Sequence, residues 1–92
     1  MGSIDKILVK FENLRQPTAL FSDVEKLLTY YGFEIDYKRG SHRIARHPLL
    51  INVDHYGADG TFTIPTVKGN KLVKQYIIKR ILKAIERVEE AS

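Results

Sequence analysis

The chain has 92 residues, of which 43% are hydrophobic and 28% charged, as is usual for one globular domain with a modest core. It contains no cysteine, which excludes disulfide bonds, thiol catalysis and thiolate metal sites. The net charge is +4, and the apolar runs are too short to span a membrane. The N-terminus has no hydrophobic stretch typical of a signal peptide. We therefore expect a cytoplasmic, membrane-independent protein with a single domain over residues 1–92.

The positive charge is concentrated in the second half of the chain. Residues 38–83 hold ten Lys and Arg against two acidic residues, whereas the rest of the chain holds five against nine. A basic segment of this kind attracts an anionic partner, and nucleic acid is the commonest one. The alternative is that these side chains are simply solvated, since Lys and Arg are mostly exposed in any protein.

Two amphipathic helices are predicted in the first third of the chain. Apolar residues at helical spacing indicate a helix over about residues 4–14, which ends before Pro17. A second helix follows, and Ser22 to Glu25 form a capping box at its start. Its buried stripe comprises Val24, Leu27, Leu28 and Tyr31. Gly32 is expected to end it.

Three strands are predicted next. Phe33–Tyr37 alternates apolar and polar residues, and Gly40 then turns the chain into a second strand over His42–His47. Pro48 ends that strand, and Leu49–Val53 is expected to extend the sheet. After a turn, Thr61–Ile64 forms the last strand.

A long basic helix is predicted over about Lys71–Glu90. Its apolar face comprises Tyr76, Ile77, Ile81, Ala84, Ile85 and Val88. Strands framed by helices indicate the α+β class, with an antiparallel sheet covered on one face.

The motif Gly40-Ser41-His42 is the best candidate for a functional site. Four basic residues surround it, namely Lys38, Arg39, Arg43 and Arg46. Histidine moves protons near neutral pH, and Arg holds phosphate in bidentate fashion. An RNA strand carries its own nucleophile, the 2′-hydroxyl, so one histidine can act on it as general base or general acid. A structural or merely exposed histidine is the alternative.

The other two histidines do not form an obvious pair with His42. His47 lies an odd number of residues away, so in a regular strand it faces the opposite way. Alternation places His42 on the same face as Ile44, which we expect to be the core side, so His42 is expected at the rim of the sheet. His55 lies near a turn. No metal-ligand spacing is present, and we expect no metal or other cofactor. Tyr56 is the best exposed tyrosine for stacking on a base.

Several segments, in this order, resemble the HicA (YcfA-like) toxins of toxin–antitoxin systems. The resemblance covers roughly residues 22–82. The matching segments are the helix from Val24 with Leu27-Leu28 and its Tyr31-Gly32-Phe33 ending, Gly40-Ser41-His42-Arg43-Ile44, Arg46-His47-Pro48, Thr63-Ile64-Pro65, Gly69-Asn70-Lys71 and Lys79-Arg80-Ile81-Leu82. The chain departs from the family after Pro65, where many relatives carry a histidine and this chain has Thr66-Val67-Lys68.

The resemblance implies a double-stranded-RNA-binding-domain-like fold, with helices on one face of a three-stranded antiparallel sheet. The core would cover about residues 22–85, with an extra N-terminal helix over about residues 4–14. It also implies a metal-independent endoribonuclease that cleaves mRNA through His42. A HicB-type antitoxin would cover the active site, in complexes that can form larger assemblies.

We expect RNA to bind the basic residues around the motif and before the last helix. These residues are Lys38, Arg39, Gly40, Ser41, Arg43, Arg46, Lys68, Lys71 and Lys74. Two alternatives fit the same pattern. One is a non-catalytic RNA-binding module of the same fold, which would hold the RNA backbone by shape. The other is an interaction domain that binds an acidic protein.

Overall fold

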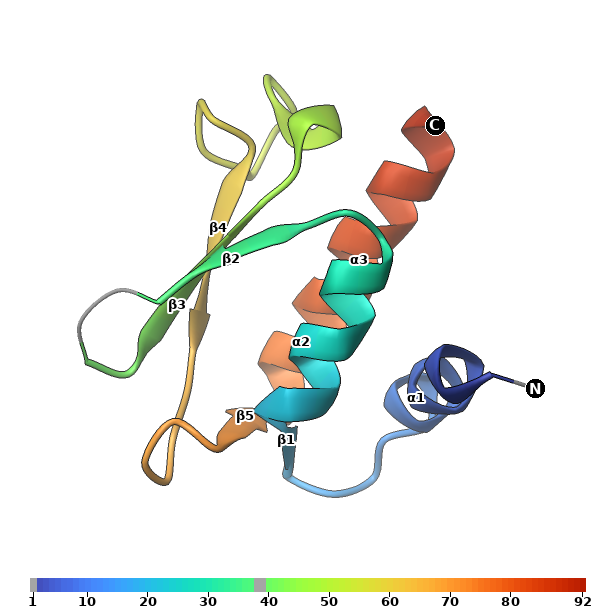
Figure 1. Ribbon diagram of the computed structural model, residues 1–92, viewed down its shortest axis with the longest axis vertical. Coiled ribbons are helices and arrows are strands. Elements are labelled where there is room, and N and C mark those ends of the chain that lie inside the picture. The colour runs from blue at the N-terminus through green and yellow to red at the C-terminus, as the bar shows by residue number, and fades with distance from the viewer. Residues whose placement is uncertain (1, 38–39) are drawn as a thin grey trace.

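The computed structural model describes residues 2–37 and 40–92 (Figure 1). Lys38 and Arg39, two of the predicted RNA-binding residues, lie outside the described residues. The elements in chain order are α1 (Ser3–Glu12), β1 (Thr18–Leu20), α2 (Phe21–Tyr30), β2 (Glu34–Asp36), β3 (His42–Arg46), the 3-10 helix η1 (Pro48–Leu50), β4 (Thr61–Pro65), β5 (Leu72–Lys74) and α3 (Gln75–Ala91). The predicted α+β class is confirmed.

The larger sheet has the order β2-β3-β4, and both pairs are antiparallel. Side chains alternate across it, so the sheet has two unlike faces. One face, which we call the buried face, carries Arg43, Ala45 and Ile64, and the last two are fully buried. The other, which we call the open face, carries His42 and Ile44 from β3. The predicted three-stranded antiparallel sheet is therefore present.

A second sheet, which the sequence did not reveal, joins α2 and α3 at their starts. β1 pairs antiparallel with β5, and each strand runs directly into a helix. The first N–H of α2, from Phe21, donates to the Lys71 carbonyl at 2.8 Å, and the first N–H of α3, from Gln75, donates to the Pro17 carbonyl at 2.9 Å. The residue just before each strand thus accepts from the first N–H of the helix that follows the partner strand, a group that a helix start leaves free.

This pairing corrects two predicted helix boundaries. The capping box at Ser22 is wrong, because α2 begins earlier at Phe21 and no side chain caps it. The last helix begins at Gln75 and not at Lys71, because Leu72–Lys74 is held extended by β1. In both cases backbone pairing between distant segments, and not a local side chain, sets the start of the helix.

The core joins residues of α1, α2 and α3 with Ala45 and Ile64 of the buried face. Three further predictions are wrong. Leu49–Val53 adds no strand, because Pro48–Leu50 forms a 3-10 turn that buries Leu50. Tyr76 is 54% exposed, and its predicted place on the buried stripe of α3 is taken by Ile78. Ile44 is half-buried on the open face, while its neighbour Ala45 is the core residue of β3. The face of β3 that carries His42 is therefore the exposed one.

The extra helix α1 packs against α2 and α3. Ile7 and Phe11 from α1 are buried in the common core, and Lys10 pairs with Asp23 of α2 at 3.0 Å. This helix is a packed part of the domain (Figure 1). Within residues 2–37 and 40–92, no helix combines the length and apolar character that crossing a membrane requires.

Candidate functional site

The turn before β3 presents the predicted catalytic histidine to solvent. Gly40 has a φ of +77°, and a Cβ placed there would meet no atom within 4 Å. Glycine is therefore needed for its left-handed backbone, and the space beside it is open. Ser41 and His42 follow, and both are exposed. His42 pairs with Pro65 of β4, so it stands at the end of the strand pair on the open face.

Thr66 fastens this turn to the hairpin between β4 and β5. Its backbone N–H donates to the Ser41 carbonyl at 2.6 Å, and its hydroxyl lies 2.7 Å from the same oxygen. The hydroxyl is also 2.8 Å from the side-chain oxygen atom of Asn70. Thr66 is only 4% exposed. The start of β3 is thus held against residues 66–70 by a buried polar contact, which we call the Thr66 clamp.

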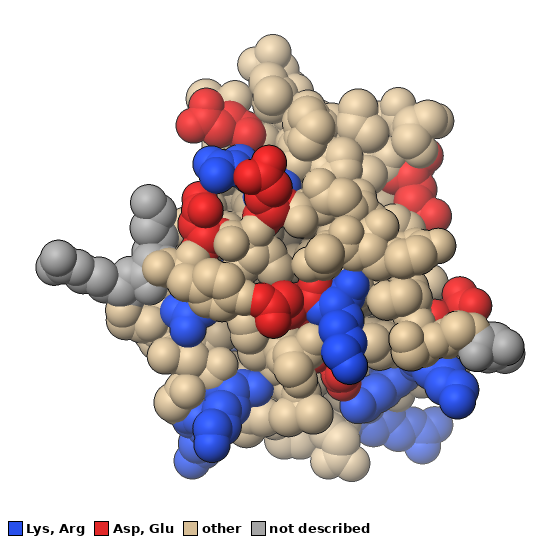
Figure 2. All heavy atoms as spheres, in the orientation of Figure 1, with Lys and Arg blue, Asp and Glu red and all other residues tan. Residues whose placement is uncertain are grey.

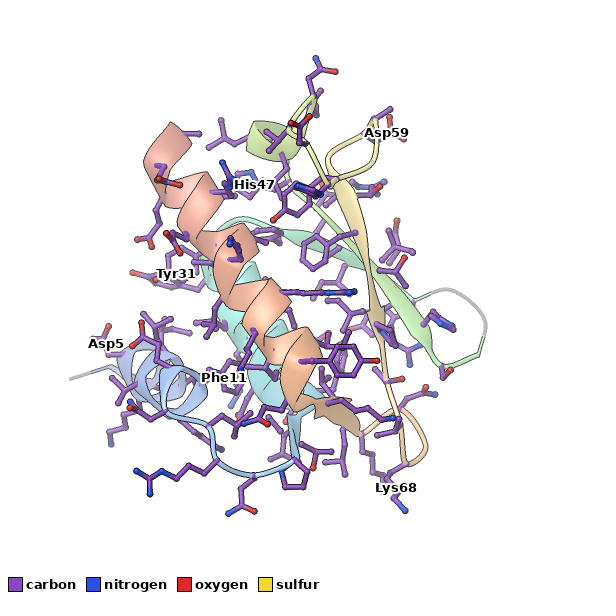
Figure 3. All side chains as sticks on the ribbon, turned by 180° about the vertical axis from the view of Figure 1, so that it is seen from behind. Asp5, Phe11, Tyr31, His47, Asp59 and Lys68 are labelled. Carbon is purple, nitrogen blue, oxygen red and sulfur yellow. The ribbon has the colours of Figure 1, made fainter. Side chains whose placement is uncertain are left out.

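The clamp brings a basic hairpin next to His42. Val67 bridges to Leu72, and the turn between them contains three consecutive residues with positive φ, Lys68, Gly69 and Asn70. Lys68 and Lys71 are exposed on this hairpin, and Lys74 is exposed at the end of β5. Figure 3 shows Lys68 and His47 at opposite ends of the molecule. Figure 2 shows most of the basic side chains in view along the lower edge of this face, while most of the acidic ones lie above them.

Arg43 has a different setting from the one the sequence suggested. It points to the buried face, where its guanidinium lies 5.0 Å from the ring centre of Tyr37 and 5.8 Å from that of Phe21. Its Nη1 donates to the carbonyls of Gly40 at 3.2 Å and His42 at 3.4 Å. Arg43 therefore holds the backbone of the turn from the side opposite to the His42 ring.

Arg46 lies on the open face between two carboxylates. Its Nη2 is 3.1 Å from Asp36 and 3.7 Å from Glu34, both on β2. The strand register explains these pairs, because Glu34 is the direct partner of Arg46 and Asp36 lies diagonally from it. Two acids therefore offset the charge of Arg46, which we predicted from the sequence to contact RNA.

His47 is buried and serves the fold. Its Nδ1 accepts from the Leu49 N–H at 3.1 Å, which leaves Nε2 to donate to the Tyr31 carbonyl at 3.0 Å. The ring also packs on Phe33, with centroids 4.8 Å apart. Both nitrogens are thus occupied, and the prediction that His47 turns away from His42 agrees with this placement.

The remaining predicted groups lie away from the Gly40–His42 turn. His55 and Tyr56 belong to the loop before β4 and line a cavity beside α3. Tyr56 is half-buried, so the prediction that it is the best exposed tyrosine is wrong, because Tyr30, Tyr37 and Tyr76 are all exposed. Burial raises the pKa of the Tyr56 hydroxyl while nearby Arg87 lowers it. Within the described part of the chain, no three His, Asp or Glu side chains gather in a way that could hold a metal ion.

Sequence reasoning missed the roles of Thr66 and Asn70. Nothing in their local pattern marks a hydrogen bond to Ser41, which is 25 residues from Thr66. The only available signal was Gly69-Asn70, a pair typical of turns, which predicts the hairpin but not what it contacts.

Together these features define a small α+β domain in which an exposed histidine stands beside a basic hairpin. A protein-family model described as the HicA toxin of bacterial toxin–antitoxin systems matches residues 21–86 of the sequence. The chain therefore belongs to the HicA toxin family. It is a toxin-type component of a toxin–antitoxin system, which implies an antitoxin partner. No curated protein and no solved structure gave a significant match.

Proposed function

We propose that this protein is an mRNA-cleaving endoribonuclease in which His42 transfers the proton. One observation carries the proposal in a chain of this family. The Thr66 clamp holds an exposed histidine, with an open left-handed glycine turn, against a hairpin that carries Lys68 and Lys71. Such an arrangement places a proton-transfer group beside cations that attract a phosphodiester.

The chemistry needs only groups of the RNA and the protein. The 2′-oxygen attacks the adjacent phosphorus while the neutral imidazole of His42 takes its proton. The bond from phosphorus to the 5′-oxygen then breaks, and that oxygen takes a proton from solvent water or from the imidazolium formed on His42. The products are a 2′,3′-cyclic phosphate and a 5′-hydroxyl end. Lysines near the phosphate stabilise the negative charge that grows on its oxygens.

The RNA contacts that we propose are narrower than the sequence suggested. Gly40, Ser41, Lys68, Lys71 and Lys74 are exposed around the clamp and are kept as RNA contacts. Arg43 holds the turn from the buried face, and Arg46 is paired with two acids. We therefore assign these two arginines to the structure of the site. Lys38 and Arg39 stay predicted RNA contacts.

Several finer properties follow from family membership and belong to the same proposal. We propose that residues 1–92 form one HicA-like domain with its core at about residues 22–85, and that the fold is double-stranded-RNA-binding-domain-like, with helices on one sheet face. The antitoxin would be a HicB-type protein that covers His42, in a complex that can assemble further. The setting would be the cytoplasm, where mRNA is translated.

A non-catalytic RNA-binding module is the second candidate, and one observation favours it. Only His42 among the three histidines stands at the turn, because both nitrogens of His47 are bonded within the fold and His55 lines another cavity. RNA cleavage needs a proton removed from the 2′-oxygen and a proton supplied to the 5′-oxygen. If no other group supplies the second transfer, the protein binds RNA without cutting it.

The test is RNA cleavage in the presence of EDTA by wild type, His42→Ala and His42→Gln. We expect cyclic phosphate ends from wild type and a loss of rate of about 100-fold or more in both variants. Thermal melting should show that both remain folded, because His42 is exposed. Lys26→Ala, an exposed change on α2, is the control for expression and purity. Full cleavage by His42→Ala would disprove the role of His42, and RNA binding without any cleavage by wild type would favour the second candidate.

A further inference from the structure

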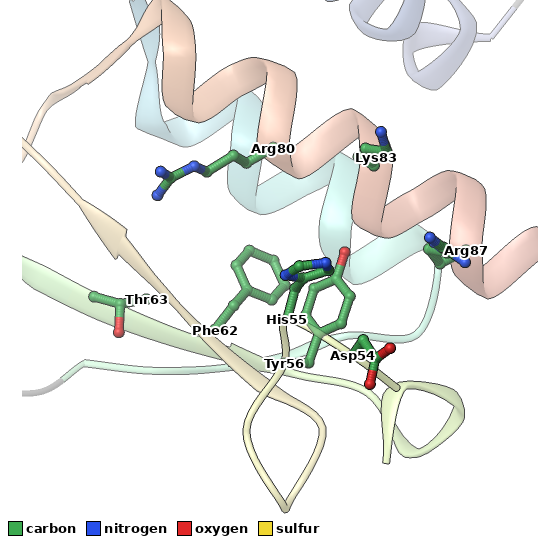
Figure 4. Close-up of a pocket in the computed structure, with 8 residues that line it drawn as sticks. All are labelled: Asp54, His55, Tyr56, Phe62, Thr63, Arg80, Lys83 and Arg87. Atoms are coloured by element: carbon green, nitrogen blue, oxygen red, sulfur yellow. The ribbon is translucent and has the colours of Figure 1, made fainter. Parts of the chain in front are cut away.

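A cavity of about 570 Å³ lies between α3 and the loop before β4, apart from the Thr66 clamp. Figure 4 shows Tyr56 and Phe62 projecting from the loop and β4 toward α3, and Arg80 reaching from α3 toward β4. Lys83 and Arg87 line the same cavity further along the helix. The site therefore combines an aromatic floor with a cationic wall.

The cationic wall is built by one face of α3. Arg80, Lys83 and Arg87 follow the spacing i, i+3 and i+7, which places them in a row along one side of a helix. All three are exposed, and within residues 2–37 and 40–92 no carboxylate lies within 4 Å of their charged nitrogens. Asp54 is the one acidic residue that lines the cavity. Like charges in a row destabilise a helix slightly, and a bound anion would offset that cost.

The aromatic floor is packed against the core. The rings of Tyr56 and Phe62 meet edge to face with centroids 5.9 Å apart, and Phe62 meets buried Phe33 in the same way at 6.0 Å. Both rings are half-buried, so part of each remains accessible from the cavity. Aromatic rings held in this way are typical platforms for nucleobases.

The cavity is within reach of His42 along the edge strand. Phe62 pairs with Ala45, three residue pairs from the His42–Pro65 pair, which corresponds to about 10 Å along β4. β4 is an outer strand of the larger sheet, so no further strand stands between the open face and the cavity. Thr63 pairs with Ile44 and is therefore on the open face, yet it also lines the cavity. A strand of a few nucleotides can therefore pass over β4 from one place to the other.

We propose that this cavity binds a nucleotide of the RNA strand that flanks the bond cut at His42. Its base stacks on the ring of Tyr56 and contacts Phe62, whose ring plane is turned by 72° from that of Tyr56. The phosphates of this nucleotide and its neighbours contact Arg80, Lys83 and Arg87. This inference rests on the proposed RNA-cleaving function and adds a second contact region to it. An acidic protein segment would also suit the three cations, but it makes no use of the aromatic surface that Tyr56 and Phe62 leave accessible in the cavity, so the observations favour RNA.

The first test neutralises the cationic wall. The variant Arg80→Gln/Lys83→Gln/Arg87→Gln keeps good helix formers on an exposed face. Its matched control, Lys6→Gln/Lys26→Gln/Lys79→Gln, removes the same charge from exposed positions that do not line the cavity. The probe is a single-stranded RNA of about ten nucleotides, methylated at every 2′-oxygen so that it cannot be cut. Its affinity is measured over a range of salt concentrations.

We expect the cavity variant to bind this RNA at least about tenfold more weakly than wild type. The slope of log affinity against log salt should fall by about 2, because each of three lost phosphate contacts contributes about 0.7. The control should stay within about twofold of wild type. Equal losses in both variants would overturn the proposal, because general charge would then explain the binding. Tyr56→Leu should weaken binding about fivefold or more, while Tyr56→Phe keeps the ring and the affinity.

Two more measurements separate this proposal from its rivals. His42→Ala should bind the uncut RNA as wild type does, so loss of cleavage leaves the cavity testable. If wild type never cuts RNA but the cavity variant loses binding, the nuclease proposal falls and the cavity stands. If AMP alone binds as tightly as the RNA, or if the cavity variant loses only an acidic peptide (poly-glutamate) and keeps RNA, the proposal is wrong.

Discussion

His42 and His47 lie five residues apart, at the beginning of β3 and just beyond its end, and they have opposite settings. His42 is exposed on the open face, next to a glycine turn and a basic hairpin, and its position is fixed from outside by the Thr66 clamp. His47 is 8% exposed, and both of its nitrogens bond to backbone groups of α2 and η1. His47 therefore stabilises the fold through both of its ring nitrogens, whereas His42 is the exposed histidine for which we propose a catalytic role.

The largest change in stability is expected at His47. In His47→Ala, the Leu49 N–H and the Tyr31 carbonyl lose their partners, and Phe33 loses a packed ring. We expect the free energy of unfolding to fall by about 2–4 kcal/mol, since each backbone group left unpaired costs about 1–3 kcal/mol. Urea denaturation measures it.

The same measurement on His42→Ala is the control for this comparison. His42 is exposed, and within residues 2–37 and 40–92 its side chain makes no hydrogen bond, so its removal should change the free energy of unfolding by no more than about 0.5 kcal/mol. If the two alanine variants lose equal stability, the contrast between the two histidines is wrong.

Gly32→Ala tests how closely the buried histidine is packed. Gly32 has a φ of +88°, and a Cβ there would lie 3.3 Å from Nε2 of His47. We expect a loss of about 1–2 kcal/mol from left-handed strain, increased by this contact. Gly69→Ala is the matched control, because Gly69 has a φ of +68° with no atom within 4 Å. A smaller loss at Gly32 than at Gly69 would contradict the close packing around His47.

The two histidine environments also differ in how far the sequence predicted them. Periodicity gave the buried stripe of α2, including Leu27 and Leu28, and the strand that starts at His42, because such patterns depend on neighbours within one element. The odd separation of His42 and His47 along the chain also predicted that their side chains point in opposite directions. It did not tell which face was buried, because Ile44 is larger than Ala45 and looked like the better core residue.

The missed features all depend on contacts between distant segments. β1 and β5 are three residues each and lie more than 50 positions apart, so neither has a pattern long enough to recognise. Their pairing sets the starts of α2 and α3, which therefore differ from the predicted ones. The clamp at Thr66, the ion pairs of Arg46 and the inward direction of Arg43 arise in the same way, from strand register and not from local sequence.

Thr66→Val examines the clamp that positions the exposed histidine. Valine keeps the shape and the backbone N–H bond to Ser41 but removes the hydroxyl that meets Ser41 and Asn70. We expect a loss of about 1 kcal/mol in the free energy of unfolding, the usual contribution of a buried hydrogen bond. Thr63→Val, at an exposed position of β4, should change it by less than about 0.5 kcal/mol. Stability equal to wild type in Thr66→Val would show that the clamp rests on the backbone alone.

The smallest effect is expected at Arg46, where the open face carries a charge that its neighbours offset. Replacing both members of one ion pair, as Arg46→Gln/Glu34→Gln, keeps the net charge and should leave the affinity for RNA and its salt dependence unchanged. The free energy of unfolding should fall by about 0.2–1 kcal/mol, the range for exposed ion pairs. Lys71→Gln, on the hairpin beside His42, should instead lower the slope of log affinity against log salt by about 0.7, the value for one lost phosphate contact. If the paired variant lowers that slope as much as Lys71→Gln does, Arg46 leaves its carboxylates to contact RNA, and the RNA-binding region extends from the His42 turn across the whole open face.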